Sequence, residues 1–233
     1  MIIKAEGISR RFLRKTGEAN FFFAVKETDF ELTPGKLTEI TGRSGSGKST
    51  FLSMLSGLLE PTAGKVTADG TDLYAMEDRE RSRFRNRNIG VIPQGHAAVG
   101  SLTVMENVLL PAGMYIQDRA EMVKWKNKAE KLLRRVGIEK LRDAWPNELS
   151  GGELRRLSIA RALMMSPGVI MADEPTGDLD DENTAAVLRL LKNCAEQGAA
   201  VLLVTHEQMA EKFADTIYVM RDGVLTYGER LPQ

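Results

Sequence analysis

The sequence GRSGSGKS at residues 42–49 decides the fold of this chain. It fits the pattern G-x-x-x-x-G-K-[ST] and stands between an expected strand over residues 37–41 and an expected helix over residues 50–58. Glycines let the backbone turn inward so that its N–H groups surround phosphate oxygens, and the helix adds the positive end of its dipole. We therefore predict a phosphate-binding loop that consists of Gly42, Arg43, Ser44, Gly45, Ser46, Gly47, Lys48, Ser49 and Thr50.

Two side chains of this loop have the chemistry that a nucleoside triphosphate requires. Lys48 would reach the β- and γ-phosphates, and the hydroxyl of Ser49 would ligate Mg²⁺. The loop by itself defines only the broad class of P-loop nucleotide triphosphatases, which includes GTPases, kinases, helicases and transporters. The choice among these depends on the rest of the chain.

Short apolar segments alternate with helical segments along most of the chain. The expected strands are residues 2–6, 21–33, 37–41, 65–69, 89–93, 169–172, 199–204, 217–220 and 224–227. The expected helices are residues 50–58, 76–87, 118–136, 152–165, 181–197 and 207–213. Short buried strands that alternate with helices predict an α/β fold with a mostly parallel sheet covered on both faces.

The segment between residues 76 and 146 has a different character, because long polar stretches there favour helices. Thr103 is expected to cap a helix that Pro111 ends. We expect residues 80–160 to form a helical insertion. The rest of a single domain over residues 1–233 would then form the α/β core and a β subdomain, in residues 1–80 and 160–233.

The composition excludes several classes of protein. The 233 residues contain 32 Lys and Arg against 32 Asp and Glu, so the surplus of positive charge that is typical of nucleic-acid binding is missing. No apolar stretch approaches the roughly 18–20 residues that a membrane span needs. The single cysteine, Cys194, cannot form an internal disulfide and is expected in the core. We therefore expect a soluble chain that works at a membrane only through a partner.

An apolar run at residues 169–172 ends in two carboxylates, Asp173 and Glu174. Ligand chemistry gathers at the carboxyl ends of strands in a parallel sheet. Asp173 is therefore placed to hold Mg²⁺, and Glu174 can polarise an attacking water as a general base. The alternative is a pair of acidic residues in a solvated loop, which the apolar run and the phosphate loop together disfavour.

Residues 149–153, with the sequence LSGGE, end 20 residues before Asp173. Here the chain resembles the ATP-binding-cassette (ABC) ATPases, whose signature motif is LSGGQ or a near variant. Further motifs of that family follow in the expected order and cover essentially the whole chain. They are the aromatic Phe12, the phosphate loop, the Q-loop glutamine Gln94, the signature Leu149, Ser150, Gly151, Gly152 and Glu153, the Walker B residues Asp173 and Glu174, the D-loop residue Asp180 and the switch histidine His206.

The resemblance implies a fold, cofactors and roles. The fold would be the P-loop ABC ATPase fold, with an antiparallel β subdomain near the N-terminus and a helical insertion. The cofactors would be ATP and Mg²⁺, and each ATP would lie between the phosphate loop of one protomer and the signature of the other in a head-to-tail dimer. The implied roles are metal binding by Ser49, Gln94 and Asp173, catalysis by Lys48, Gln94, Glu174 and His206, adenine stacking by Phe12 and contact between protomers by Asp180.

Some segments depart from the family pattern or have a second interpretation. His96, within residues 94–99, stands where relatives usually have an aromatic, in a segment that faces the membrane partner in the family. Phe21, Phe22 and Phe23 are expected to serve core and edge packing of a β segment. The arginine run over residues 79–87 is expected to form a solvated helix face, and contact with phospholipid headgroups or an acidic loop of a partner is the alternative.

Three kinds of cassette protein compete as interpretations of the function. DNA-repair ATPases would need long coiled-coil or zinc insertions, and translation-type factors would need two phosphate loops; the sequence has one loop and a short insertion. We therefore expect a transporter subunit at the cytoplasmic face of the membrane. Its permease would be a separate chain, its second cassette an identical or different chain, and no nucleic acid is expected.

Two segments narrow the expected transporter type. Residues 101–108 and 172–180 resemble the subgroup for lipoprotein release, macrolide efflux and antimicrobial-peptide export. An exporter of this kind is therefore the favoured interpretation. The ATPase subunit of an amino-acid-type importer is the alternative.

Overall fold

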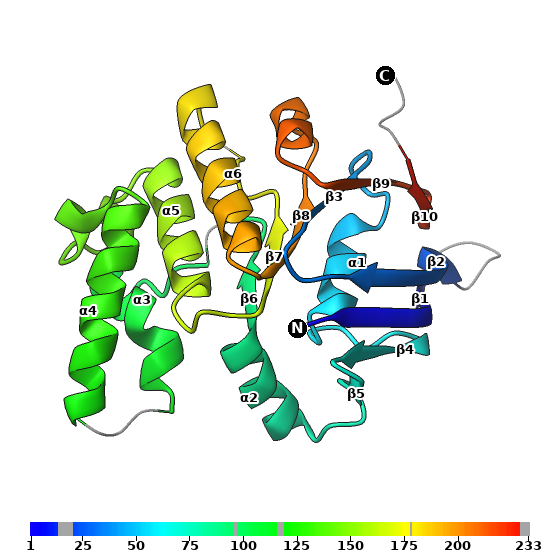
Figure 1. Cartoon of the computed structure of the whole chain (residues 1–233), viewed down its shortest axis with the longest axis horizontal. Coiled ribbons are helices and arrows are strands. Elements are labelled where there is room, and N and C mark those ends of the chain that lie inside the picture. The colour runs from blue at the N-terminus through cyan, green and yellow to red at the C-terminus, as the bar shows by residue number, and fades with distance from the viewer. Residues whose placement is uncertain (14–20, 96, 116–118, 178, 229–233) are drawn as a thin grey trace.

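The computed structural model describes residues 1–13, 21–95, 97–115, 119–177 and 179–228. Figure 1 shows two sheets with helix α1 (Lys48–Leu55) between them, and further helices on the other face of the larger sheet. The expected α/β fold, with a mostly parallel sheet and an antiparallel sheet near the N-terminus, is confirmed.

The smaller sheet is antiparallel and has the order β2-β1-β4-β5. Its strands are β1 (Ile3–Leu13), β2 (Phe21–Leu32), β4 (Ala63–Ala68) and β5 (Thr71–Asp72). The first strand runs well beyond the expected residues 2–6, because Phe12 and Leu13 still pair with Phe22 and Phe21 of β2.

The larger sheet has the order β10-β9-β3-β8-β7-β6 and is parallel except for the hairpin of its last two strands. Every residue of the central strands β3, β7 and β8 is buried. The apolar runs of β7 and β8 predicted this, whereas β3 buries Thr38, Glu39 and Thr41 as well. The strands are β3 (Leu37–Thr41), β6 (Ile89–Ile92), β7 (Val169–Asp173), β8 (Ala200–Val204), β9 (Thr216–Arg221) and β10 (Val224–Tyr227).

Two hydrophobic cores lie on the two faces of the larger sheet. One core joins α1, the inner face of the small sheet and alternate residues of β3, β7 and β8; the other joins the opposite residues of these strands to α3–α6. Cys194 lies in the second core, as expected. The helices are α2 (Asp78–Asn88), α3 (Val104–Gly113), α4 (Arg119–Arg135), α5 (Gly151–Ala162) and α6 (Asp181–Glu196), with short 3₁₀ helices at Glu139–Leu141, Pro146–Glu148 and Gln208–Lys212. Within the described ranges, no helix is both long and apolar enough to cross a membrane.

Two expectations about local structure are wrong. Pro111 does not end its helix but lies inside α3: it has no N–H for the carbonyl of Asn107, yet the N–H of Met114 still donates to the carbonyl of Leu110 and continues the turn. Of the core and edge packing expected for Phe21, Phe22 and Phe23, only the core part is wrong: they lie on edge strand β2, where Phe21 packs on Phe23 and Phe22 on Phe12, and each residue is 39–45% exposed.

The arginine run lies on α2, which has no buried residue: Arg79, Arg83 and Arg87 are exposed, and Arg81 and Arg85 are half-buried. Arg85 donates to the carbonyl of Gly57, and Arg81 pairs with Asp78. The expectation of a solvated helix face agrees with this exposure. Contact of α2 with a lipid or protein partner stays a prediction.

A buried asparagine organises the turn before α3. The Asn107 side chain is fully buried and accepts the N–H of Val99 at 2.8 Å, while the two N–H groups of its Nδ2 are shared among the carbonyls of Val99, Leu102 and Thr103 at 2.9–3.1 Å. Thr103 caps the helix in a reciprocal pair with Glu106, as its sequence position predicted. One amide therefore fixes residues 99–103 relative to the helix.

We expect Asn107→Leu to lower the free energy of unfolding by about 1–3 kcal/mol, because it removes every hydrogen bond of the amide at nearly constant volume. Urea denaturation followed by circular dichroism measures the change. Asn127→Leu, at an exposed position of α4, is the matched control and should leave the free energy of unfolding within about 0.5 kcal/mol of the unmodified chain. Equal midpoints for the two variants would contradict this role of Asn107.

Candidate functional site

The phosphate loop, which connects β3 to α1, lies so close to the backbone of β2 and β9 that two of its positions exclude a side chain. A Cβ atom at Gly47 would lie 2.1 Å from the carbonyl oxygen of Ala24, and one at Gly42 would lie 2.3 Å from that of Met220. Gly47 has a φ of 109°, which favours glycine. In the described part of the chain, neither a side-chain cap nor an acidic residue occupies the first turn of α1. The N–H groups at its start are thus available to an anion.

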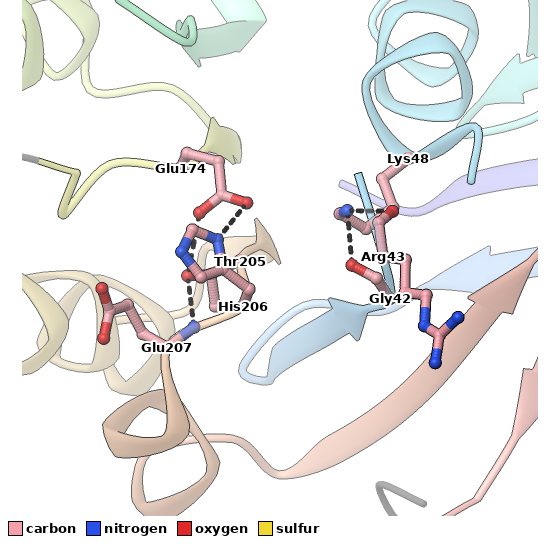
Figure 2. A network of polar contacts seen from close by, with 7 residues as sticks. All are labelled: Gly42, Arg43, Lys48, Glu174, Thr205, His206 and Glu207. Atoms are coloured by element: carbon pink, nitrogen blue, oxygen red, sulfur yellow. Dashed lines mark hydrogen bonds and ion pairs between the residues drawn. The ribbon is translucent and has the colours of Figure 1, made fainter. Parts of the chain in front are cut away.

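Lys48 is buried at the start of α1 and points back into the loop. Its ammonium group donates to the carbonyl of Gly42 at 2.7 Å and to that of Arg43 at 3.1 Å (Figure 2). Burial lowers the pKa of Lys48, and the charges of Glu174 and Asp173 act in the opposite direction. A triphosphate in the loop would offer this ammonium group stronger acceptors than two carbonyls.

Asp173 is the last residue of β7, and its environment fits a divalent cation. Its carboxylate is buried, and Oδ1 has no hydrogen-bond partner among the residues described. Burial raises the pKa of Asp173, while a hydrogen bond from the Ser49 side chain and the charge of Lys48 act against the rise. A buried carboxylate oxygen beside a hydroxyl is the kind of hard donor set that Mg²⁺ prefers.

Glu174 is joined to the segment that follows β8. Its Oε1 lies 2.9 Å from Nδ1 of His206, and its Oε2 accepts a hydrogen bond from Oγ1 of Thr205 at 3.2 Å. Figure 2 shows this group facing the side of the site where Lys48 and the loop lie. Glu174 has a φ of 48°, in the left-handed region. The arrangement holds one carboxylate at the strand end with both oxygens engaged.

Gln94 and Phe12 lie outside this cluster. Gln94 is exposed just after β6, and Phe12 is part of β1 in the smaller sheet. The Phe12 ring packs at 5.9 Å from the ring of Phe22, and the guanidinium of Arg10 lies 4.9 Å from its centre. Phe22 is therefore a second aromatic side chain beside Phe12. The sequence analysis expected Phe22 to serve only packing of the β segment.

Ser150 is the N-cap residue of α5, which begins one residue before the expected helix start at residue 152. Its N–H and its hydroxyl both donate to Oε2 of Glu153 at 2.8 Å, and its hydroxyl also accepts the N–H of Glu153. These bonds lower the pKa of the Glu153 carboxyl. The helix α5 packs in the core on one face of the larger sheet, and α1 packs in the core on the other. One chain therefore does not bring its signature to its own phosphate loop.

Asp180 caps α6 by accepting the backbone N–H and the side-chain amide of Asn183 at 2.8–2.9 Å. Its carboxylate is exposed, and its contact with a second protomer stays a prediction. His96, the departure from the family pattern, lies outside the described residues.

The sequence analysis missed Arg155, which ties α5 to the Q-loop. Arg155 is only 3% exposed, and its Nη1 donates to the carbonyl of Pro93 at 2.9 Å and to that of Gly95 at 3.2 Å. These two carbonyls flank Gln94. Arg161, two turns further along the helix, donates to the carbonyl of Ala97. In the sequence, an arginine in a polar helix start gives no signal of burial.

A glycine loop before a helix, an acidic strand end beside it and a lysine between them define the class of P-loop nucleotide triphosphatases. A model of the family described as "ABC transporter" matches residues 25–177, and the chain belongs to this family. The chain is 37% identical over 229 residues to the ABC transporter ATP-binding protein YtrE of Bacillus subtilis (strain 168), which is 97% of this chain and 98% of that protein.

Two further comparisons agree with this assignment. The lipoprotein-releasing system ATP-binding protein LolD of Porphyromonas gingivalis is 36% identical over 226 residues, 97% of this chain and 99% of that protein. The dimeric structure of a post-hydrolysis state of the ATP-binding cassette MJ0796 bound to ADP and Pi matches with a TM-score of 0.87 at 31% identity, covering 98% of this chain and 100% of that chain. The prediction of an ABC ATPase is confirmed.

We expect Arg155→Met to release the Q-loop from α5, because the carbonyls of Pro93 and Gly95 lose their donor. The free energy of unfolding should fall by about 1–3 kcal/mol, and amide hydrogen exchange in residues 94–97 should rise more than elsewhere. Arg134→Met, at an exposed position of α4, is the control with the same loss of charge. Unchanged exchange in residues 94–97 would show that Arg155 does not hold the loop.

Proposed function

We propose that the chain binds Mg²⁺-ATP at residues 42–50, hydrolyses it, and thereby drives a separate membrane permease of the exporter type. The observation that carries the nucleotide site is the buried, unpaired oxygen of Asp173 beside Lys48 and Ser49 at the start of α1. A site with these charges and an uncapped helix start lacks only an anion and a cation. Mg²⁺-ATP supplies both.

Each residue of this site has a separate role in phosphoryl transfer. The loop N–H groups and Lys48 would hold the phosphates, Ser49 and Asp173 would hold Mg²⁺, and Gln94 would have to move in from its exposed position to join them. Bound Mg²⁺ would offset the negative charge of the β- and γ-phosphates. Glu174 accepts the proton of the attacking water, and His206 keeps the water and the γ-phosphate in place. Phe12 stacks on the adenine.

The signature completes the site of a second protomer. The start of α5 offers Ser150, Gly151 and Gly152 to an anion, yet α5 and α1 pack on opposite faces of the same sheet. Two chains arranged head to tail would bring each signature, including Leu149 and Glu153, to the other's phosphate loop. The dimeric form of the MJ0796 cassette supports this arrangement. Asp180 would lie at the contact between the protomers.

In this proposal, the helical part of the chain couples ATP hydrolysis to transport. In this proposal, residues 80–160 form the helical part that turns nucleotide state into movement of the permease, and residues 1–80 and 160–233 form the core with the β subdomain. The chain would sit at the cytoplasmic face of the membrane. Similarity to LolD over 97% of the chain favours the exporter type over an amino-acid-type importer.

We expect Glu174→Gln to lower the ATPase kcat at least about 100-fold, because the amide cannot accept the proton of the attacking water. The variant should still bind ATP and accumulate as a dimer, which light scattering measures at increasing ATP concentration. Glu196→Gln, at an exposed position of α6, should retain the unmodified rate. Hydrolysis by Glu174→Gln at the unmodified rate would refute the general-base role.

We expect Glu153→Gln to lower the ATP concentration needed for dimerisation several-fold. The Glu153 carboxylate occupies both donors of Ser150 and adds a negative charge where the γ-phosphate of the partner's ATP would lie. The neutral amide still caps the helix but competes less with phosphate. The measurement is made in the Glu174→Gln background, so that the dimer accumulates.

The matched control for this experiment is Glu148→Gln. Glu148 accepts the N–H of Trp145 in a similar cap five residues earlier and has no bond to Ser150. It should not move the ATP midpoint. If both variants move the midpoint equally, the effect comes from net charge and not from release of Ser150.

A further inference from the structure

Thr205 lies between the strand β8 and the switch histidine and is held in place by the sheet. Its side chain is fully buried, and its N–H donates to the carbonyl of Ile40 in β3. The N–H of Glu174 in turn donates to the carbonyl of Val204. The backbones that carry the threonine hydroxyl and the glutamate are therefore fixed to the same row of the sheet.

The hydroxyl of Thr205 has only one direction in which to donate. A hydroxyl has one proton and two lone pairs. The N–H of Glu207 donates to Oγ1 of Thr205 at 3.1 Å and so occupies one lone pair, while Oε2 of Glu174 lies 3.2 Å from the same oxygen (Figure 2). A carboxylate oxygen can only accept, so the proton of Thr205 points to Glu174.

The two partners of the Glu174 carboxylate differ in their freedom to move. His206 holds Oε1, and its side chain is 70% exposed, so it can turn towards a phosphate without disturbing the core. Thr205 holds Oε2 from a fully buried position. When His206 turns away, Oε1 loses its partner and Oε2 keeps its own.

We propose that Thr205 is a positioning residue for Glu174. This proposal rests on the proposed function, in which Glu174 is the general base. The hydroxyl of Thr205 holds Oε2 in place and leaves Oε1 as the oxygen that faces the attacking water. The water proton passes to Oε1, the water oxygen bonds to the γ-phosphorus, and the bond from that phosphorus to the bridging oxygen of ADP breaks. Thr205 itself exchanges no proton.

The test compares Thr205→Val, which removes the hydroxyl at the same volume, with Thr205→Ser, which keeps it. We expect Thr205→Val to lower kcat about 10–100-fold with KM for ATP unchanged, since misplacement of a catalytic group slows the chemical step. Thr205→Ser should recover kcat to within about threefold. Thr205→Ala is measured as well, because it removes the hydroxyl without adding volume. Thr226→Val, a hydroxyl lost from the exposed strand β10, should keep the unmodified rate.

Three results would overturn the role of Thr205. They are an unmodified kcat in Thr205→Val and Thr205→Ala, an equal loss of rate in Thr205→Ser, and a higher ATP midpoint for dimerisation when Thr205→Val is added to Glu174→Gln. The last two would assign Thr205 to packing or to nucleotide binding. Hydrolysis by Glu174→Gln alone refutes the general base itself, so failure of the proposed function is seen separately from failure of the threonine role.

Discussion

The parallel pairing of β3, β8 and β7 is the constraint on which the site depends. Ile40 pairs with Val204, and Val204 pairs with Asp173, so the carboxyl ends of the three strands lie in one row. The phosphate loop, the acidic pair and the Thr205–His206 segment all leave the sheet from that row. A shift of one residue in either pairing would exchange the two faces of a strand whose residues pack in two different cores. The site is therefore fixed by the same contacts that fix the fold.

The two faces of this sheet support different parts of the site. The core that contains α1 supports the phosphate loop, and the core that contains α3–α6 supports the signature and the buried arm of Arg155. Arg155 reaches from α5 to the backbone on both sides of Gln94, so the Q-loop belongs physically to the signature side as well as to the sheet. A movement of α5 relative to the sheet would therefore displace the backbone on both sides of Gln94 through Arg155, and that of Ala97 through Arg161.

The sequence was sufficient to predict those parts of the site whose geometry depends only on the local backbone conformation. The glycine loop and the acidic end of β7 follow from glycine geometry and strand polarity. The sequence was insufficient to predict contacts between a side chain and a segment that lies far away along the chain. The burial of Arg155 and the joint hold of Thr205 and His206 on Glu174 depend on which loops the sheet brings together. The exposure of Phe21–Phe23 depends on where edge strand β2 leaves the core, which the apolar run itself does not reveal.

The backbone of Glu174 has an evolutionary consequence. Its φ of 48° is a conformation that glycine adopts freely and that another residue adopts at a cost of about 1–3 kcal/mol. Selection for a robust fold alone would favour glycine at this position. In the proposed function, the carboxylate of Glu174 serves hydrolysis at this position at a cost in stability. Directed evolution for heat resistance, without a screen for activity, would therefore tend to discard this carboxylate early.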